Sequence, residues 1–193
     1  MTVKRRPGRR PGSADTRGEI LSAARKVFAE KGFDKATVRG IAREAKVDPA
    51  LVHHYFDTKD RMFAEAMRLP ITPELVLPTL LEGPREELGR RLVTLILTVT
   101  AAPETREPMI ALIRSAMTNE RAAQMFQEFV SNALLSRVAA ELGVPPLRIE
   151  AAFSQMFGVL MARYVLKLEP MASAEPEELV ELLAPTIQRY FVG

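Results

Sequence analysis

The chain has 193 residues, of which 47% are hydrophobic and 26% charged, and it contains no cysteine, so neither a disulfide nor a cysteine-ligated zinc site can be part of the fold. The net charge is only +3, but residues 1–61 carry 15 Lys and Arg against 8 Asp and Glu, a net +7, whereas residues 62–193 carry 12 against 16, a net −4. This asymmetry suggests that one part of the chain meets a polyanion, although basic termini are also common as solvated tails.

The chain starts with a basic segment that we interpret as a disordered arm. Residues 1–13 combine Pro, Gly and cationic side chains with no apolar periodicity. A helix is predicted to begin at Thr16, because Thr16 and Glu19 match the capping box, in which two side chains satisfy each other's backbone amides. Apolar residues then recur on one helical face as far as Phe28, and Gly32 is placed to end this helix.

Three short helices are predicted next. The first follows Thr37, which can cap it, and extends to Ala45. After a break of two or three residues, Asp48 supplies an N-cap acid and is followed by a proline at the first helical position; the helix that it opens ends near Tyr55. Residues 57–60 then cap a further helix whose apolar face consists of Met62, Phe63, Ala66 and Met67.

The character of the chain changes after Leu69. Prolines at positions 70, 73, 78 and 84 predict a connector with short helical turns. Helical periodicity then returns in five segments, at residues 85–101, 105–117, 120–142, 147–168 and 176–191. No segment alternates with the period of a strand over a useful length, so the predicted fold is all-α. The longest apolar run, residues 92–102, is about half a membrane span, and no apolar stretch follows the twin arginines that a secretion signal would need, so we expect a cytoplasmic protein outside the membrane.

The short helices around residues 37–55 form a helix-turn-helix pattern, in which the second helix is strongly capped and a tight turn joins the two. A helix of about two turns cannot bury enough surface to be stable alone, so it needs the scaffold of the neighbouring helices. Held in this way, its N-terminal end can project into a major groove of DNA, which admits one helix.

The residues that carry this pattern resemble the DNA-binding domain of the tetracycline-repressor (TetR) family. The match consists of TVRxIAxxAxV at residues 37–47 and LVHHYFxTKD at residues 51–60, and the resemblance extends over about residues 14–70. It implies a transcriptional regulator, most often a repressor, with its recognition helix near residues 49–55. Residues 71–193 would then form a helical domain for ligand binding and dimerisation, and the partner would be a palindromic DNA operator.

The resemblance also implies roles for single positions. The DNA contacts would be Thr37 and Arg39 to phosphates, Pro49, Ala50 and His53 to base edges, His54 and Tyr55 to phosphate, sugar or thymine methyl groups, and Lys59 to a phosphate. The residue chemistry agrees, because Thr37 and Thr58 precede helices whose N-terminal amides favour a phosphate. Pro49 and Ala50 are small and apolar, which suits close approach to a thymine methyl group.

Two features depart from the family pattern. Lys46 occupies the tight-turn position that usually carries Gly; a left-handed Lys costs about 1 kcal/mol, and its ammonium would add a phosphate contact. The recognition helix also lacks Arg, Asn and Gln for bidentate base reading, so we expect DNA shape and the arm to supply much of the specificity. The arm residues that would follow the adjacent minor groove are Arg5, Arg6, Arg9 and Arg10, although a plain solubility tail is the alternative.

The C-terminal part contains a stripe of small residues that predicts a helix–helix contact. We predict a symmetric dimer interface of two helices from each subunit, formed by Ala151, Ser154, Gly158, Ala162, Val165, Leu183, Ile187 and Tyr190. The alternative is that these faces pack within one subunit. This end, at residues 164–166 and 185–190, also resembles the C-terminal domain of one TetR subgroup.

A cavity for a hydrophobic small-molecule effector is expected among Met and Phe side chains, which line adaptable cavities but also fill ordinary cores. The residues concerned are Met109, Ile113, Met117, Phe126, Phe129, Phe153 and Phe157, with Arg114 and Gln155 as polar partners of the ligand.

Other classes of function are less well supported. A non-specific architectural DNA-binding protein would share the basic arm but would not need a capped recognition helix. An enzyme is disfavoured because the sequence has no Gly-rich phosphate loop, no nucleophile motif and no cluster of catalytic acids, so we predict no catalytic residue and no cofactor. His53 and His54 are adjacent, so their side chains point about 100° apart on a helix, and we predict no metal site there.

Overall fold

The structure is a computed structural model, which describes residues 13–192; the predicted arm, with Arg5, Arg6, Arg9 and Arg10, lies outside the described residues. All regular elements in the described range are helical, as predicted. The helices are α1 (Ser13–Lys35), α2 (Val38–Ala45), α3 (Pro49–Tyr55), α4 (Lys59–Met67), α5 (Pro73–Leu81), α6 (Leu88–Ala101), α7 (Pro103–Thr118), α8 (Glu120–Glu128), α9 (Ser136–Leu142), α10 (Pro146–Leu160) and α11 (Pro176–Val192). A short 3₁₀ turn, η1 (Arg85–Glu87), precedes α6, and two π-helical segments, η2 (Phe129–Leu135) and η3 (Met161–Val165), follow α8 and α10.

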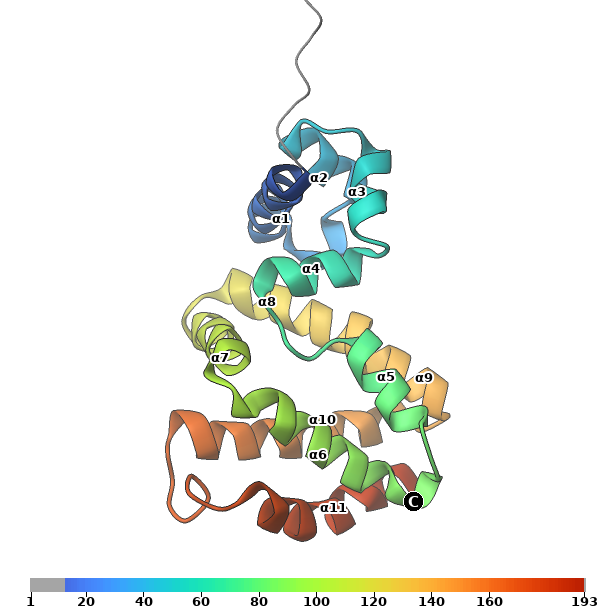
Figure 1. The fold of residues 1–193 in the computed structure, drawn as a ribbon, viewed down its shortest axis with the longest axis vertical. Helices are drawn as coiled ribbons and strands as arrows, with labels where there is room; N and C mark the ends of the chain where they lie inside the picture. The colour runs from blue at the N-terminus through green and yellow to red at the C-terminus, as the bar shows by residue number, and fades with distance from the viewer. Residues whose placement is uncertain (1–12, 193) are drawn as a thin grey trace, which may run out of the picture.

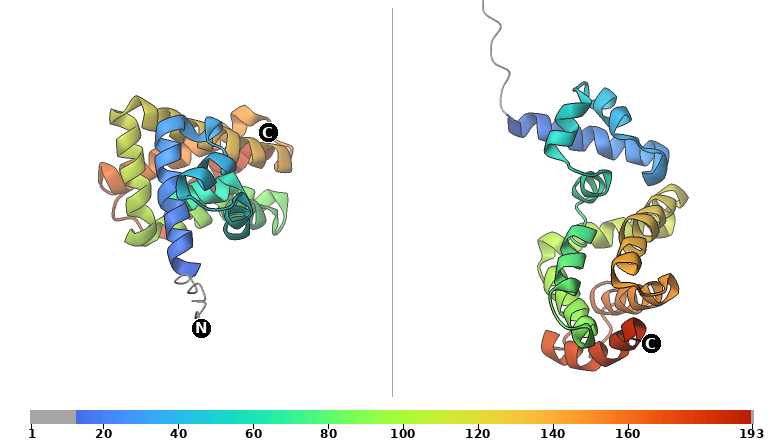
Figure 2. Two further views of the ribbon diagram at one scale, coloured as in Figure 1. Left: turned by 90° about the horizontal axis from the view of Figure 1, so that it is seen from above. Right: turned by 90° about the vertical axis from the view of Figure 1, so that its right-hand side faces the viewer.

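The molecule has an upper unit made of α1 to α4 and a lower bundle made of α5 to α11 (Figure 1). Two further views show the same division, and the upper unit stands on α8 of the bundle (Figure 2). Within residues 13–192, no helix combines the length and the apolar character that crossing a membrane requires.

The first helix differs from the prediction at its start. It begins at Ser13 rather than Thr16, so Thr16 lies inside the helix and the predicted capping box does not form the helix start. The predicted break at Gly32 is confirmed, because its φ of 78° and ψ of 176° are non-helical and readily adopted only by glycine.

The proline-rich connector is more ordered than expected. Residues 73–81 form α5, a full helix that starts with Pro73 at its first turn and contains Pro78. A proline is favourable at the first helical position because that amide has no partner in the helix. The side chains of Val76 and Leu80 are buried and join the core of the lower bundle.

The lower bundle is held together by a very close crossing of α6 and α11. A Cβ atom placed on Gly89 of α6 would lie 2.5 Å from the carbonyl oxygen of Ala184 and 2.6 Å from the backbone nitrogen of Gln188. The Gln188 side chain binds the start of α6, since its Oε1 accepts a hydrogen bond from the Gly89 amide at 2.7 Å. It thereby satisfies one of the amides that a helix N-terminus leaves unpaired.

Candidate nucleic-acid interface

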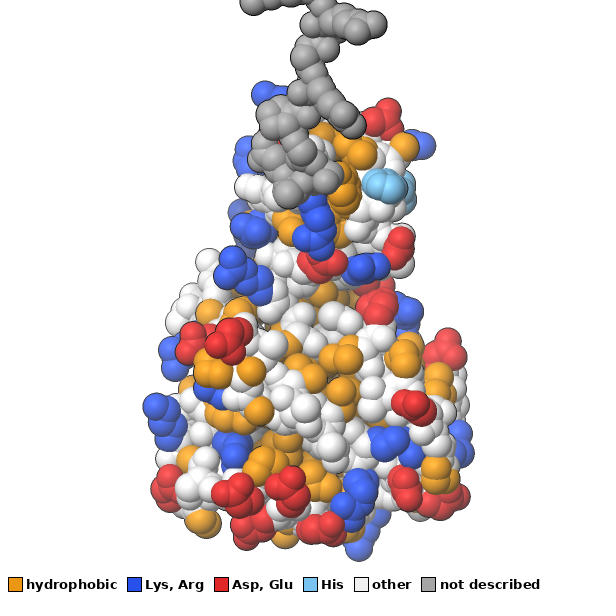
Figure 3. All heavy atoms as spheres, in the orientation of Figure 1, with side chains coloured by type: hydrophobic (Ala, Val, Ile, Leu, Met, Phe, Trp, Pro, Cys, Tyr) orange, Lys and Arg blue, Asp and Glu red, His pale blue; other side chains and the backbone are white. Residues whose placement is uncertain are grey.

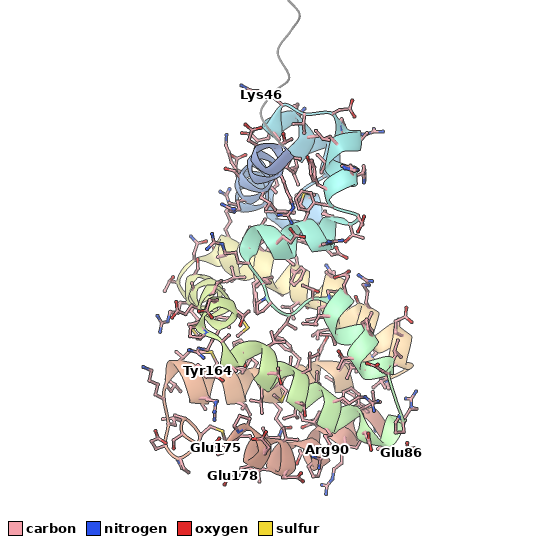
Figure 4. All side chains as sticks on the ribbon, in the orientation of Figure 1. Lys46, Glu86, Arg90, Tyr164, Glu175 and Glu178 are labelled. Atoms are coloured by element: carbon pink, nitrogen blue, oxygen red, sulfur yellow. The ribbon has the colours of Figure 1, made fainter. Side chains whose placement is uncertain are left out.

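The tight turn of the helix-turn-helix is built as the sequence predicts. The Thr37 side chain caps α2 by accepting a hydrogen bond from the Gly40 amide at 3.1 Å. Lys46 ends the helix with φ 56° and ψ 40°, in the left-handed region, and its amide is directed to the carbonyls of Ala42 and Arg43. The chain therefore accommodates lysine where glycine is the less strained choice. The side chain of Lys46 is exposed and lies at the upper end of the molecule (Figure 4).

The second helix of the motif, α3, has an anchored side and an exposed side. Asp48 caps it, because its Oδ1 accepts the amide of Ala50 at 2.7 Å, and Pro49 occupies the first turn. Val52 is fully buried and fixes α3 to the unit, whereas Ala50 and the two following histidines at positions 53 and 54 are exposed. A seven-residue helix is thus held by its scaffold and offers its N-terminal end to a partner.

The remaining predicted contacts of this unit are distributed around α3. Thr37, Arg39 and Thr58 are exposed, and Tyr55 is half-buried, with its ring 5.3 Å from that of His54. Thr58 caps α4 by accepting the amide of Arg61 at 3.1 Å. The caps at Thr37, Asp48 and Thr58 were all predicted from the sequence. Histidine side chains are visible on the surface of the upper unit (Figure 3), and residues 13–192 contain no group of His and acidic side chains arranged for a metal.

Lys59 is engaged differently from the expectation. Its Nζ donates hydrogen bonds to the carbonyl oxygens of Phe33 at 3.0 Å and Asp34 at 3.3 Å, and it lies 4.4 Å from the centre of the Phe33 ring. The ammonium thus binds carbonyl groups at the C-terminal end of α1 instead of projecting towards solvent. A phosphate contact by this group would compete with three interactions inside the protein.

The charge distribution favours the approach of a polyanion from the upper end. Glu44 on α2 is paired with Lys26, whose Nζ lies 2.6 Å from Glu44 Oε1, and this hydrogen bond raises the pKa of Lys26 and lowers the pKa of Glu44. Acidic side chains gather at the opposite end of the molecule (Figure 3), where Glu86, Glu175 and Glu178 lie (Figure 4). A polyanion would therefore be repelled by the carboxylates at that opposite end.

The lower bundle contains a cavity of about 110 Å³ lined only by apolar side chains. Six predicted residues line it: Met109, Ile113, Phe126, Phe129, Phe153 and Phe157. Three predictions were wrong. Met117 is 67% exposed and Arg114 is also exposed, because both lie on the outer side of α7, and Gln155 is not part of the lining. Apolar residues of the connector and of α6, such as Ile71 and Leu92, also line the cavity. The spacing of these residues in the sequence did not indicate that they would do so.

The predicted dimer surface divides into an exposed and a buried part. Ser154 and Gly158 of α10 are exposed, Ala151, Ala162, Val165 and Tyr190 are half-buried, and a Cβ placed on Gly158 would meet nothing within 4 Å. The assignments of Leu183 and Ile187 were wrong, since they are 7% and 0% exposed and belong to the core of the subunit. The close crossing of α6 at Gly89 covers that face of α11. Leu147 of α10 and Leu182 of α11, which were not among the residues assigned to the interface, are apolar side chains that are 76% and 64% exposed.

Comparison with known proteins agrees with this architecture. A family model for bacterial regulatory proteins of the tetR family matches residues 20–66, and a model for the C-terminal domain of tetracycline-repressor-like proteins matches residues 86–191. The HTH-type transcriptional regulator BetI of Brucella anthropi is 30% identical over 159 residues, which are 82% of this chain and 70% of BetI. BetI of Agrobacterium fabrum is 28% identical over 174 residues, 86% of this chain and 84% of that protein. The crystal structure of a TetR-family regulator from Streptomyces coelicolor A3 is similar, with a TM-score of 0.54 and 31% identity over 97% of this chain and all of that one.

Proposed function

Because the chain belongs to the TetR family of DNA-binding transcriptional regulators, we propose that it is a cytoplasmic, homodimeric repressor that a small apolar ligand releases from a palindromic operator. Residues 14–70 would be the DNA-binding domain, and residues 71–193 the regulatory and dimerisation domain. The observation that carries the proposal is α3, a short helix capped by Asp48 and anchored by the buried Val52, with Ala50 exposed at its N-terminal end.

The dimer is supported by the exposed part of α10 and α11. Small side chains at Ser154 and Gly158 allow another helix to approach closely, and Leu147 of α10 and Leu182 of α11 are exposed apolar side chains on the same two helices. A symmetric dimer would present two copies of α3, which can enter successive major grooves about 34 Å apart. A ligand that favours a different spacing of the two helices would weaken binding to the operator.

The proposed function is tested by selecting binding sites from random duplex DNA with the purified full chain. Enrichment of a palindrome with half-sites about one helical turn apart is expected for a specific dimer. Binding without enrichment would favour the architectural alternative, and an absence of binding would contradict the proposal. The selected duplex then serves as the operator in the measurements below.

Deletion of residues 1–12 should weaken operator binding and flatten its dependence on salt. If each of the four arm arginines neutralises one phosphate, the slope of log K against log salt should fall by about 0.9 per arginine and subunit. Replacing the four arginines with lysine preserves the charge and should preserve most of the slope. A deletion variant with an unchanged slope would identify the arm as a solubility tail.

Gly158→Arg should convert the dimer into a monomer without unfolding the subunit. The position is exposed and has open space around it, but in the proposed interface an arginine would hold the two copies of α10 apart. Sedimentation velocity should show the loss of dimer, and circular dichroism an unchanged helix content. Ala111→Arg, on the exposed side of α7, is the matched control and should remain dimeric. A Gly158→Arg chain that still dimerises would place the interface elsewhere.

A further inference from the structure

One aromatic ring of the lower bundle both lines the cavity and packs against the upper unit. Phe129, at the start of η2, lines the cavity and is 2% exposed. Its ring centre lies 4.8 Å from that of Phe63 in α4 and 5.7 Å from that of Phe33 at the end of α1. Phe28, Phe33 and Phe63 also contact one another edge-on or stacked, with centres 4.9 to 6.1 Å apart. A displacement of Phe129 therefore reaches the core of the DNA-binding unit directly.

The preceding residue makes a polar contact with the same segment. Glu128 is 9% exposed, and its Oε2 accepts the amide of Asp34 at 2.9 Å, while its Oε1 accepts the side-chain amide of Gln124 at 2.9 Å. One turn later, Asn132 Nδ2 donates to the Asp34 carboxylate at 3.1 and 3.3 Å. Gly32 allows this approach, because a Cβ there would lie 3.1 Å from Glu128 Oε2.

The end of α1, which Glu128 contacts, also contacts the start of α4. The carbonyls of Phe33 and Asp34 hold the ammonium of Lys59, at the first position of α4. Phe63, one turn further along α4, contacts Phe129. The segment 128–132 thus contacts both α1 and α4 of the upper unit, at the point where the α-helical α8 changes into the π-helical η2. Such transitions in a helix are found frequently at functional sites.

We infer that Phe129 and Glu128 are positioning residues, which couple the content of the cavity to the orientation of the DNA-binding unit. An apolar molecule in the cavity displaces the ring of Phe129, and the displaced turn weakens the hydrogen bond between Glu128 and the Asp34 amide. This inference rests on the proposed function and specifies its ligand. The wholly apolar lining selects an uncharged molecule, and a cavity of about 110 Å³ approaches the size, about 150 Å³, of an engineered apolar cavity that holds benzene.

The test fills the cavity with a side chain, so the natural ligand need not be known. Ala152 lines the cavity and is 2% exposed, so Ala152→Leu places additional carbon atoms inside it. Hydrogen exchange of the Asp34 amide should become about tenfold faster in this variant, because its acceptor has moved. Ala111→Leu makes the same change on the exposed side of α7 and should leave that exchange rate unaltered.

The role of Phe129 is isolated by repeating the measurement in a Phe129→Leu background, where Ala152→Leu should add no further change. Benzene, added to the wild-type chain, is a second probe that does not depend on the folding of a variant. It should accelerate Asp34 exchange in the wild type and not in Phe129→Leu. Equal responses with and without Phe129, or no response of the wild type to either probe, would overturn the coupling.

These outcomes are separate from those of the operator selection, because hydrogen exchange is measured without DNA. If the chain selects no operator but shows the hydrogen-exchange response, the proposed repressor function is refuted and the coupling is not. If the chain binds its operator, and the Ala152→Leu and Ala111→Leu variants bind it with the same affinity, the coupling is refuted and the repressor function is not. If the coupling is correct, Ala152→Leu should weaken operator binding at least tenfold, and Phe129→Leu should abolish that difference.

Discussion

Gly89→Ala should destabilise the protein by about 3 kcal/mol, although it exchanges a poor helix former for the best one. The added Cβ would lie 2.5 Å from the carbonyl oxygen of Ala184 and 2.9 Å from Cα of Gln188, both backbone atoms that cannot rotate away. The helices α6 and α11 would have to separate, which also breaks the hydrogen bond from the Gly89 amide to Gln188. The free energy of unfolding in urea, measured at one fixed protein concentration, checks this expectation.

Gly18→Ala is the matched control for that substitution. Gly18 lies within α1, is exposed, and has open space where its Cβ would be placed. The same chemical change should therefore stabilise the protein by up to about 1 kcal/mol, through helix propensity alone. If both variants gain stability, α6 and α11 do not cross at the distance seen here.

Ala50→Glu should lower the affinity for the selected operator by at least about a hundredfold, because it places an unpaired carboxylate in a groove lined with phosphates. Ala50 is exposed at the second position of α3, where a negative charge favours the helix itself, so the fold should be unaffected. In a homodimer the penalty applies in both half-sites. Fluorescence anisotropy with labelled operator measures the loss, and thermal unfolding verifies the fold.

Ala50→Ser is the corresponding control, since a small neutral side chain adds no charge and should change affinity far less. If Ala50→Glu binds as tightly as the wild type, the N-terminal end of α3 does not enter the groove. The exposed edge formed by Thr37 and Arg39 would then be the next surface to test.

The features that were predicted correctly depend on neighbours in the sequence. The caps at Thr37, Asp48 and Thr58 each bind an amide two or three residues ahead, so a short motif contains the whole interaction. The left-handed backbone of Lys46 was expected from the resemblance to the TetR family, in which this position of the turn usually carries glycine. The cavity was predicted in part, since six of its Met, Ile and Phe residues were named from residue type.

The features that were missed depend on partners far along the chain. The apolar periodicity of α11 marks Leu183 and Ile187 as buried, but not whether another helix of the same subunit or a second subunit covers them. Only the close crossing at Gly89 decides this. In the same way, the ammonium of Lys59 reaches carbonyls 25 and 26 residues earlier, and Glu128 reaches an amide 94 residues earlier. Contacts between residues so far apart in the sequence cannot be predicted from the pattern of a short segment.

The cavity also affects how the protein responds to compression. Side chains that face a cavity lose packing contacts, at about 24 cal/mol for each Å³, so about 110 Å³ costs roughly 2.6 kcal/mol relative to a filled core. Unfolding eliminates internal voids and so reduces the total volume of protein and water, which hydrostatic pressure favours. Any molecule that fills the space should make the folded chain more resistant to pressure. The volume change of unfolding therefore reports occupancy of the cavity without knowledge of the occupant.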